Sequence, residues 1–550
     1  MLFRNFLASK ALRERRRVGR SYRRLRRDQQ LDKLSRLLVE LYTTPLPRPS
    51  QHVDGAPDVE NIELAVRQYL LFRFSNVKIN SKILSCLPDR KLNTCLPPDW
   101  FPILEGNGFA VNRVGCRVKW LGYLLVLIFY GIFVAAREVY YAISFREFVA
   151  EKLDQSVMFV GYRKNSLPDN QYIVSENNQK TIISWYAKWD GRPPEISQAV
   201  SQARGNSSLY RNGFRYKPMP FDGVPLPFLS ALNLLIWTII HGASATFSLM
   251  RGKWWSAFML HEVVLVKKIE LTSHQCLPKQ YLFDHSACSY KPLWAYTAEK
   301  RGAECIVYFY STNSAGFFDK NNMRFHFPAF YIMNWSRYLV WSEEHRDFMA
   351  DIHRNNQIPS FPYFQNVGPI PFEDSGLMLG AVSEPAIAIF DVSPVRDALY
   401  WPLGANVEYY VPSVVNRFLE DVYDAANALG ITVLHKRKRD HKRFHHPKYE
   451  RQCASMRQRI GWHEVEASIS AFRVIDMVDI VISLPFTSTA LIGVAQGKPS
   501  IYYDPTGGIN TADRAAFGVP IVTNKADLQS WMEETLLDLS CEKTYEISTT

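Results

Sequence analysis

The stretch that decides the fold is SLPFTSTALIGVAQGKPSIYYDPTG, residues 483–507. An apolar strand over 479–484 runs into Pro485, and a short helix over 489–496 follows it and is closed by a glycine. A second apolar strand then ends at Asp504. This strand–helix–strand order predicts a parallel sheet with helices on both of its faces.

The same alternation extends along the second half of the chain. It begins near residue 256 with helical spacing, continues through strands such as ECIVYFYSTN, and restarts at the buried-type strand EPAIAIFDVSP, residues 384–394. The two runs predict an α/β protein with two Rossmann-like domains facing a cleft, where ligands sit beyond the carboxyl ends of the strands. The expected divisions are a basic, partly apolar helical extension over 1–118, apolar segments within or before the first domain over 119–255, and α/β domains over 256–383 and 384–550.

Most of the net charge of +12 belongs to the first residues of the chain. Residues 1–36 contain 13 Lys or Arg residues and three acidic residues, which leaves the rest nearly neutral. This segment fits a helix on an anionic membrane surface or a solvated basic arm. We expect no nucleic-acid partner, because no aromatic-interleaved or metal-knuckle module accompanies the charge.

The eight cysteines are scattered and form no CxxC pair. Their spacing argues against a zinc ribbon or a disulfide scaffold and favours a reducing compartment. No apolar segment of the signal-peptide kind follows the basic residues, so we expect no secretory signal.

Two apolar segments precede the α/β pattern. Residues 120–136 are uncharged over 17 positions, which is short for a membrane span. Residues 225–250 are longer but contain Asn233 and His241, which are costly at the centre of a bilayer. Both segments are compatible either with membrane spans or with buried or interface-embedded helices.

Three hydroxyl residues, Thr487, Ser488 and Thr489, stand where the strand at 479–484 gives way to a helix. The free backbone N–H groups and the dipole of a helix N-terminus attract phosphate, and hydroxyls add donors without charge. The alternative is ordinary helix capping by Ser and Thr.

A basic stretch, VLHKRKRDHKRFHHPKY at 433–449, follows a strand and is expected to open into the same cleft. Its cations could neutralise a departing nucleotide phosphate, or form only a solvated loop. A zinc site through His441 and His445 is a third possibility, but the surrounding cations disfavour a divalent ion. The stretch supplies Lys436, Arg437, Lys438, Arg439, Lys442 and Arg443, with His441, His445 and His446 beside them.

At these residues the sequence resembles a known family. LPFTSTALIGVAQGKPSIYYDPTG looks like the signature of the bacterial polysaccharide biosynthesis PFTS motif proteins, and further similarity extends over roughly 280–510. The resemblance implies a GT-B-like glycosyltransferase with the acceptor domain first and the nucleotide-sugar domain second, independent of metal and without a cofactor beyond its donor. HHPKY also resembles the His-Pro motif of bacterial sialyl- and polysialyltransferases, which implies a CMP-linked donor and a phosphate or acid role for His446.

The catalytic base is the least determined part of the site. Asp284, which lies with His285 at a strand end, ranks first as the candidate base, before Glu373 with Asp374 and before Asp391. Each of these residues could instead cap a helix or a turn. Asp504 could contact a ribose or cap the next turn. The predicted site residues are Asp284 and His446 as catalytic groups; Lys436, Lys438, Arg439, His445, Pro485, Phe486, Thr487, Ser488, Thr489 and Asp504 for the donor nucleotide; and Ser311 and Asn313 for the acceptor.

The expected function is sugar transfer from a nucleotide sugar to a lipid-linked or surface glycan acceptor, in lipopolysaccharide, O-antigen or capsule synthesis. The expected location is the cytoplasmic face of the inner membrane, peripheral or anchored through 120–136. A GT-B-fold nucleotide-sugar epimerase and a non-catalytic, membrane-associated assembly partner are the rival hypotheses.

Overall fold

The computed structural model describes most of the chain beyond residue 90, and shorter pieces before it. The described residues are 62–74, 91–149, 152–154, 156–160, 181–185, 209–211, 214–219, 224–284, 290–309, 311–312, 333–355, 362–370, 385–394, 411–437 and 445–549, with 17, 19–21, 23–24, 27–28, 37, 40–41, 44, 53, 83, 377, 380 and 382.

The first sheet has the order β3-β4-β2-β1-β5-β6-β7-β8 within the described part of the chain. β3 pairs antiparallel with β4, and the registered pairs from β4 through β7 are parallel. Without β3, the strands follow the doubly wound order, and the direction of winding reverses between β1 and β5. The bounds are β1 Val157–Val160, β2 Thr181–Trp185, β3 Leu209–Arg211, β4 Phe214–Met219, β5 Gln280–Asp284, β6 Glu304–Tyr308, β7 Arg337–Val340 and β8 Tyr363–Asn366.

The second sheet has the order β11-β10-β9-β12-β13-β14, and every neighbouring pair is parallel. This is the 3-2-1-4-5-6 order of a Rossmann sheet, with the reversal between β9 and β12. The bounds are β9 Ala386–Phe390, β10 Thr432–Lys436, β11 Trp462–Val465, β12 Ile480–Ser483, β13 Ser500–Tyr503 and β14 Ile521–Val522.

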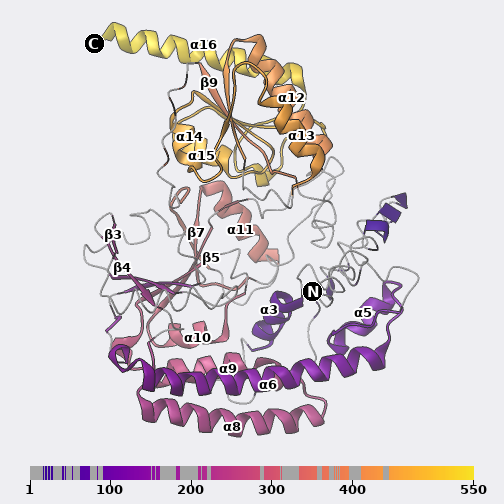
Figure 1. The fold of residues 1–550 in the computed structure, drawn as a ribbon, viewed down its shortest axis with the longest axis vertical. Coiled ribbons are helices and arrows are strands. Elements are labelled where there is room, and N and C mark those ends of the chain that lie inside the picture. Colours follow the sequence, from indigo (N-terminus) through magenta and orange to yellow (C-terminus); the bar gives the residue numbers. More distant parts are fainter. Residues whose placement is uncertain are drawn as a thin grey trace, which may run out of the picture. The chain divides into compact units, whose positions relative to one another are not determined.

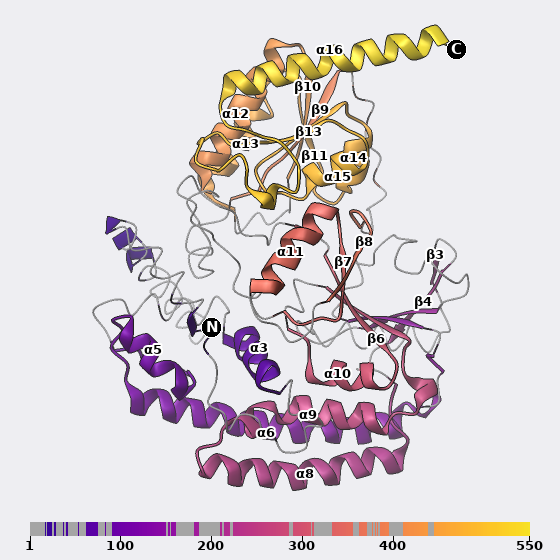
Figure 2. The same cartoon turned by 180° about the vertical axis from the view of Figure 1, so that it is seen from behind.

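Helices cover these sheets and form a separate layer near the first one (Figure 1, Figure 2). The α-helices are α3 Ile62–Phe74, α5 Phe101–Gly106, α6 Arg113–Ser144, α8 Phe228–Met250, α9 Trp255–Leu271, α10 Leu293–Lys300, α11 Glu343–Asn355, α12 Pro412–Ala428, α13 Pro447–Met456, α14 Ala471–Asp476, α15 Thr489–Ala495 and α16 Lys525–Thr549. Short 3-10 helices are η2 Pro98–Trp100, η3 Arg146–Phe148, η5 His274–Cys276 and η9 Arg514–Ala516.

The chain divides into two compact units, one around each sheet. The first contains the described residues up to Phe309, together with 333–339, 352–355 and 362–365. The second contains 311–312, 340–351 and the described residues from Asn366 onward. The prediction of two α/β sheets is therefore confirmed, and each unit has its own buried core.

The first sheet begins earlier in the chain than the sequence pattern indicates. Strands β1 to β4 lie between residues 157 and 219, inside the segment expected to lie within or before the first domain. They are short and widely spaced along the sequence, so no strand–helix alternation marks them. The position of β1 between β2 and β5 places this segment at the centre of the first sheet.

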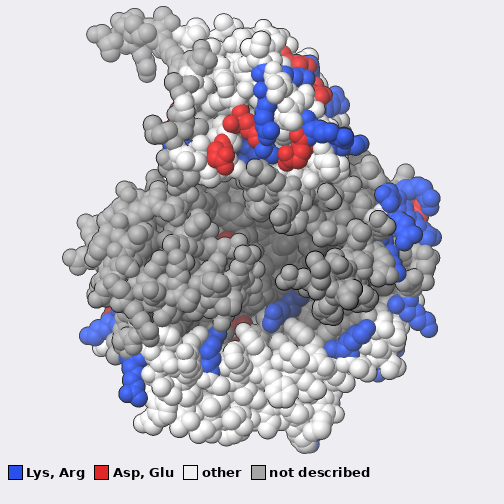
Figure 3. Space-filling view, in the orientation of Figure 1, with Lys and Arg blue, Asp and Glu red and all other residues white. Residues whose placement is uncertain are grey.

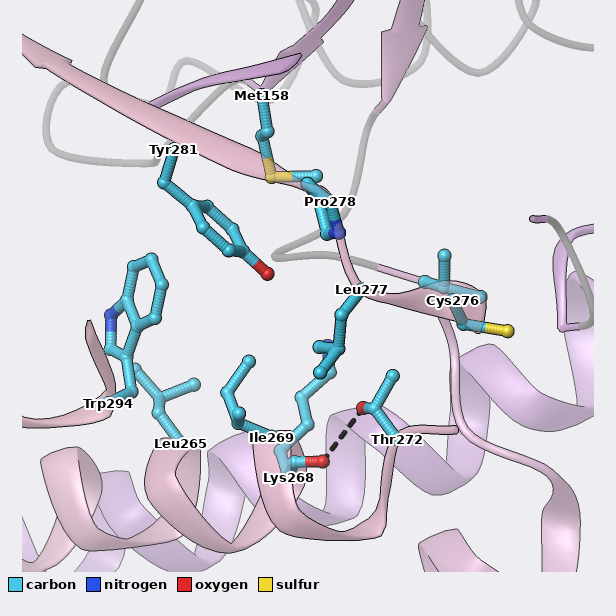
Figure 4. Close-up of a pocket in the computed structure, with 11 residues that line it drawn as sticks. Met158, Leu265, Lys268, Ile269, Thr272, Cys276, Leu277, Pro278, Tyr281 and Trp294 are labelled. Atoms are coloured by element: carbon cyan, nitrogen blue, oxygen red, sulfur yellow. Dashed lines mark hydrogen bonds between the residues drawn. The ribbon is translucent and has the colours of Figure 1, made fainter. Parts of the chain in front are cut away.

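The two apolar segments form α6 and α8, both long and apolar enough to cross a membrane. They contact each other, and both contact α9, most of whose side chains are buried. α9 also packs against α10 and lies beside β1 and β5 at a small cavity of about 20 Å³ (Figure 4). Its lining includes Met158, Tyr281 and Trp294. This volume holds about one water molecule, so the cavity marks tight packing instead of a substrate site.

In the second unit, the stretch at 483–507 folds as its pattern predicts. β12 and β13 are buried along their whole lengths, and α15 connects them. Gly493 is buried in α15, and a Cβ there would collide with Ser500 and approach Val481 at 3.0 Å. The absence of a side chain therefore allows α15 to lie directly on the two strands.

We predict that Gly493→Ala destabilises the second unit by about 1–3 kcal/mol, because the added methyl group overpacks the interface between α15 and the strands. Chemical denaturation followed by tryptophan fluorescence measures the change. Val494→Ala, at the neighbouring half-exposed position, is the matched control and is expected to change the free energy of unfolding by less than about 1 kcal/mol. Equal stability of Gly493→Ala and the wild type would contradict the close-packing argument.

Candidate functional site

The carboxyl ends of β9 and β12 meet at the reversal point of the second sheet. The loop after β9 contains Asp391 and Ser393, and the turn after β12 contains the PFTS tetrad. The backbone N–H of Leu484 donates to the carbonyl of Phe390 at 2.9 Å, and that of His446 donates to Pro394 at 2.8 Å. Three segments that are distant in sequence therefore share the edge at which α/β sheets bind ligands.

A deeply buried polar cluster at this edge is centred on the Asp391 carboxylate. His435 Nε2 lies 3.0 Å from Asp391 Oδ2, and the Tyr449 hydroxyl donates to the same oxygen at 2.6 Å. The other oxygen accepts from the N–H and hydroxyl of Ser393 at 2.7 and 3.2 Å. The side chains of Asp391 and His435 are 0% exposed. The cluster links the ends of β9 and β10 to α13.

Burial alone would raise the pKa of Asp391, but the hydrogen bonds and charge of His435, with the Tyr449 and Ser393 donors, hold it below its ordinary value. Burial and the neighbouring Asp391 charge raise the pKa of Tyr449 well above its ordinary value. Asp391 is therefore an ionised hydrogen-bond acceptor and Tyr449 a neutral donor at neutral pH. A carboxylate enclosed in this way is poorly placed to take a proton from a substrate.

The second ring nitrogen of His435, Nδ1, is buried and has no hydrogen-bond partner among the described residues. The ring lies 5.1 Å from that of Trp462, whose indole N–H is also buried without a described partner. Neither His435 nor Tyr449 was predicted as a site residue from the sequence. The available signal was a histidine in the otherwise apolar strand TVLHK and a tyrosine two residues after the His-Pro pair.

The PFTS turn uses its hydroxyls to hold its own shape. Phe486 has a φ of +60°, a left-handed conformation that is unusual for an aromatic residue, and its ring packs 5.8 Å from that of Tyr502. The Thr487 hydroxyl donates to the carbonyl of Leu484 at 2.8 Å, and the Thr489 hydroxyl lies 2.9 Å from that of Ser483. Two of the three predicted donor-site hydroxyls therefore stabilise the turn.

Ser488 is partly exposed, and its hydroxyl donates to that of Ser311 at 3.4 Å. The structure thus brings a predicted acceptor residue against a predicted donor residue, within the second unit. Pro485 is buried in the same turn. Asn313 lies outside the described residues.

The described part of the basic stretch is held by protein partners. Lys436 Nζ donates to the carbonyl of Ala467 at 3.3 Å. Arg437 forms ion pairs with Glu450 at 3.1 Å and with Glu464. Burial alone would lower the pKa of Arg437, but the Glu464 charge raises it above its ordinary value. His445 Nδ1 lies 2.5 Å from Glu450 Oε1.

The remaining basic-stretch positions include the predicted phosphate ligands Lys438 and Arg439. These two, with His441, Lys442 and Arg443, lie outside the described residues. The same is true of two alternative bases, Glu373 and Asp374. It is also true of His285, which follows Asp284.

The other predicted site residues occupy different positions. His446 caps α13, and its Nδ1 accepts from the backbone N–H of Lys448 at 3.1 Å. In the neutral ring this leaves the proton on Nε2. Asp504 is fully buried and accepts from Thr506 and from the N–H of Ile509, so it organises the loop after β13. Asp284 ends β5 in the first unit and is partly exposed.

A charged pocket of about 620 Å³ follows the edge strand β11 to its carboxyl end. Arg437 and Glu450 line it from the side of β10 and α13, and Trp462 and Glu464 line it from β11 itself. Its size is that of a pocket for a small organic ligand. The described residues contain no group of three or more His, Cys, Asp or Glu side chains that could hold a metal ion.

A family model describes residues 235–532, which is more than half of the chain. The chain therefore belongs to the family of polysaccharide biosynthesis PFTS motif proteins. No curated protein sequence matches it.

Several solved structures resemble parts of the chain at low identity. An α,α-trehalose-phosphate synthase (UDP-forming) from Burkholderia vietnamiensis is 9% identical, with a TM-score of 0.34 over 70% of this chain and 89% of that one. UDP-GlcNAc 2-epimerase from Methanocaldococcus jannaschii is 8% identical, with a TM-score of 0.34 over 69% and 91%. Arabidopsis thaliana UGT89C1 complexed with UDP is 10% identical, with a TM-score of 0.36 over 70% and 90%.

We predict that Asp391→Asn destabilises the second unit by about 3 kcal/mol at pH 7, because it removes the charge that the buried His435 and Tyr449 are arranged around. The pKa of Asp391 is lower in the folded protein, so its ionised form contributes stability above the ordinary aspartate pKa of about 3.9. The contribution is lost as the pH falls through the lower folded-state value.

The difference in free energy of unfolding between the wild type and Asp391→Asn should therefore be largest at neutral pH and shrink below about pH 4. Urea denaturation over a pH series measures it. Asp538→Asn, on an exposed part of α16, is the control and should show little difference at any pH. A pH-independent effect of Asp391→Asn would contradict an ionised Asp391.

Proposed function

We propose that this protein is a glycosyltransferase of surface polysaccharide synthesis that binds its nucleotide-sugar donor at the carboxyl edge of the second sheet. The observation that carries the proposal is the meeting, at one edge of a doubly wound sheet, of the family's PFTS turn, the His-Pro cap of α13 and a charged pocket. Membership of a polysaccharide biosynthesis family supports a role in carbohydrate chemistry.

In the proposed reaction, an acceptor hydroxyl attacks the anomeric carbon of the donor sugar. The bond from that carbon to the nucleotide phosphate oxygen breaks, and the phosphate leaves with the electron pair. Asp284 takes the hydroxyl proton, and it is preferred to Asp391 because Asp391 is enclosed by hydrogen-bond donors. The leaving phosphate is stabilised by Ser488, Lys438, Arg439 and the Nε2–H of His446.

The Asp391 cluster has a positioning role in this proposal. Its hydrogen bond to Tyr449 fixes the first turn of α13, and the N–H of His446 donates to the carbonyl of Pro394. Both contacts hold the His-Pro cap beside the loop that follows β9. The reaction needs no metal ion in this scheme, because the proposed cationic and hydroxyl ligands stabilise the leaving phosphate.

The proposed location is the cytoplasmic face of the inner membrane, where lipid-linked acceptors are available. The length and apolar character of α6 and α8 support membrane association. The net positive charge of residues 1–36 supports attraction to anionic lipid headgroups. Lipopolysaccharide, O-antigen and capsule precursors are the proposed acceptor classes, and a CMP-linked sugar is the first donor to test.

One observation favours a second candidate, a non-catalytic assembly partner that has kept the fold. Arg437 and His445 are engaged by Glu450, which reduces the positive charge that a donor phosphate would meet. Nucleotide binding distinguishes the two candidates, because an assembly partner of this kind needs no donor.

We predict that one of CMP, UDP, GDP and dTDP raises the unfolding temperature of the purified protein. Stabilisation follows from binding to the folded state alone and amounts to about 2.7 kcal/mol at a nucleotide concentration 100 times Kd. A thermal-shift titration measures it. Ser488→Ala and Arg439→Ala should weaken the affinity at least about tenfold, because each removes a phosphate ligand worth more than 1.4 kcal/mol.

Lys498→Ala is the matched control. Lys498 precedes β13 and so lies at the amino edge of the sheet, and its loss should leave nucleotide affinity unchanged. Failure of all four nucleotides to shift the wild type would favour the assembly partner and overturn the proposed donor site.

A further inference from the structure

The outer face of the α6 and α8 pair is a continuous apolar surface. Val114 and Phe129 on α6 are 73% and 70% exposed, and Leu229 on α8 is 77% exposed. The surface continues along both helices, and we call it the apolar face. Its large exposed residues are Val114, Val118, Leu121, Leu125, Val126, Phe129, Tyr130, Phe133, Tyr140 and Ile143 on α6, and Phe228, Leu229, Leu232, Ile236, Ile239, Ile240, Phe247 and Met250 on α8.

Charged residues are excluded from this face and gather at its ends. No charged residue lies between Lys119 and Arg137 in α6 or anywhere in α8. Exposed cations stand at the borders: Arg117 near the start of α6, Arg146 after its end, and Arg251 and Lys253 after α8. Figure 3 shows the lower border of the molecule, where these helices lie, as a white surface with Lys and Arg above it. An apolar face with a basic rim matches an anionic lipid surface.

The opposite face of the pair carries buried ionic groups. Glu138, the only acidic residue in the two helices, lies 3.0 Å from Lys268 of α9, and both side chains are almost completely buried. Gly131 brings α6 close to α9, because a Cβ there would meet Leu260 at 3.0 Å. Deeper in the unit, Glu262 of α9 accepts from the N–H of Leu293, the first residue of α10.

These contacts argue against a transmembrane placement of the pair. α9 runs beside both helices, so spanning would carry its ionic groups into hydrocarbon. The other side of α9 packs on α10, and Figure 4 shows residues of α9, β1 and β5 around the same small cavity. The loops and strand ends beside these strands cannot lie in hydrocarbon, where their backbone groups would lack partners. α6 is also about 48 Å long at 1.5 Å per residue, whereas the hydrocarbon core is about 30 Å thick.

We infer that α6 and α8 lie parallel to the membrane plane, with the apolar face immersed in one leaflet and Arg117, Arg146, Arg251 and Lys253 at the level of anionic headgroups. The first unit is thus seated on the membrane without crossing it. This inference deepens the membrane association in the proposed function and does not depend on the transferase activity.

Flotation with vesicles tests whether lipid covers the apolar face. The purified full-length protein should float with phosphatidylcholine vesicles containing phosphatidylglycerol and bind several-fold less to phosphatidylcholine alone. Phe129→Glu combined with Ile240→Glu should reduce partitioning more than tenfold, because both charges enter hydrocarbon. Ile460→Glu, at an 89% exposed position in the second unit, is the matched control and should float like the wild type.

Cysteine labelling distinguishes one-leaflet seating from spanning. Ala110 precedes α6 and Asp154 follows it, and both are exposed. In inside-out membrane vesicles, Ala110→Cys and Asp154→Cys should both react with a membrane-impermeant maleimide, as read by site-resolved mass spectrometry. The exposed native Cys541 reports that the labelled side is the one that carries the second unit. Protection of only one of the two introduced cysteines would establish a span and overturn the inference.

Two other results would also overturn it. One is flotation of the double-glutamate variant equal to that of the wild type. The other is a wild-type dimer that binds no vesicles and becomes monomeric in the variant, which would make the apolar face a contact between two copies. A nucleotide thermal shift retained in the double-glutamate variant would show that it is folded. Failure of membrane seating can thus be separated from failure of the donor site.

Discussion

The buried Asp391 carboxylate is a central constraint on the second unit. Its four hydrogen bonds come from the loop after β9, from β10 and from α13, and a charge enclosed at this depth is tolerated only with such partners. The loop after β9 and the start of α13 must therefore stay together. The PFTS turn joins them because β12 is hydrogen-bonded to β9. The hydrogen bonds that one buried carboxylate requires therefore hold the segments of the candidate site together.

The second sheet was predictable because its signals are local. Apolar strands, glycine-closed helices and short connections recur from residue 384 onward, and they correctly place β9, β10, β12 and β13. The first sheet was predictable only in its second half, since β1 to β4 are short strands separated by long intervals. The site was predicted in part: the turn at Thr487 and Ser488 lies at a strand end, as expected. The ion pairs of Arg437 were not predictable, because Glu450 and Glu464 reach it only through the strand register and the position of α13.

Composition could not distinguish a spanning placement of α6 and α8 from the in-plane placement that we propose. A spanning helix and an in-plane helix can have the same apolar content, and they differ in which of their faces contacts protein. The contacts of α9 supply this information. The sequence of α9 is that of an ordinary helix, but its packing against α10 shows which face of the α6–α8 layer is turned toward the protein. The buried Glu138–Lys268 ion pair lies on the face of the layer that is turned toward the protein.

The position of β1 has a further consequence for the meaning of the family signature. The sequence shared with the family begins at residue 235, inside α8, whereas β1, at 157–160, is hydrogen-bonded between β2 and β5 in the middle of the first sheet. A shortened chain limited to the shared region would lose its central strand and leave β5 as an unprotected edge, open to pairing with other chains. The region that matches the family is therefore shorter than the region that forms the first sheet. The most recognisable part of the chain depends on β1, which its family signature does not include, to cover the edge of β5.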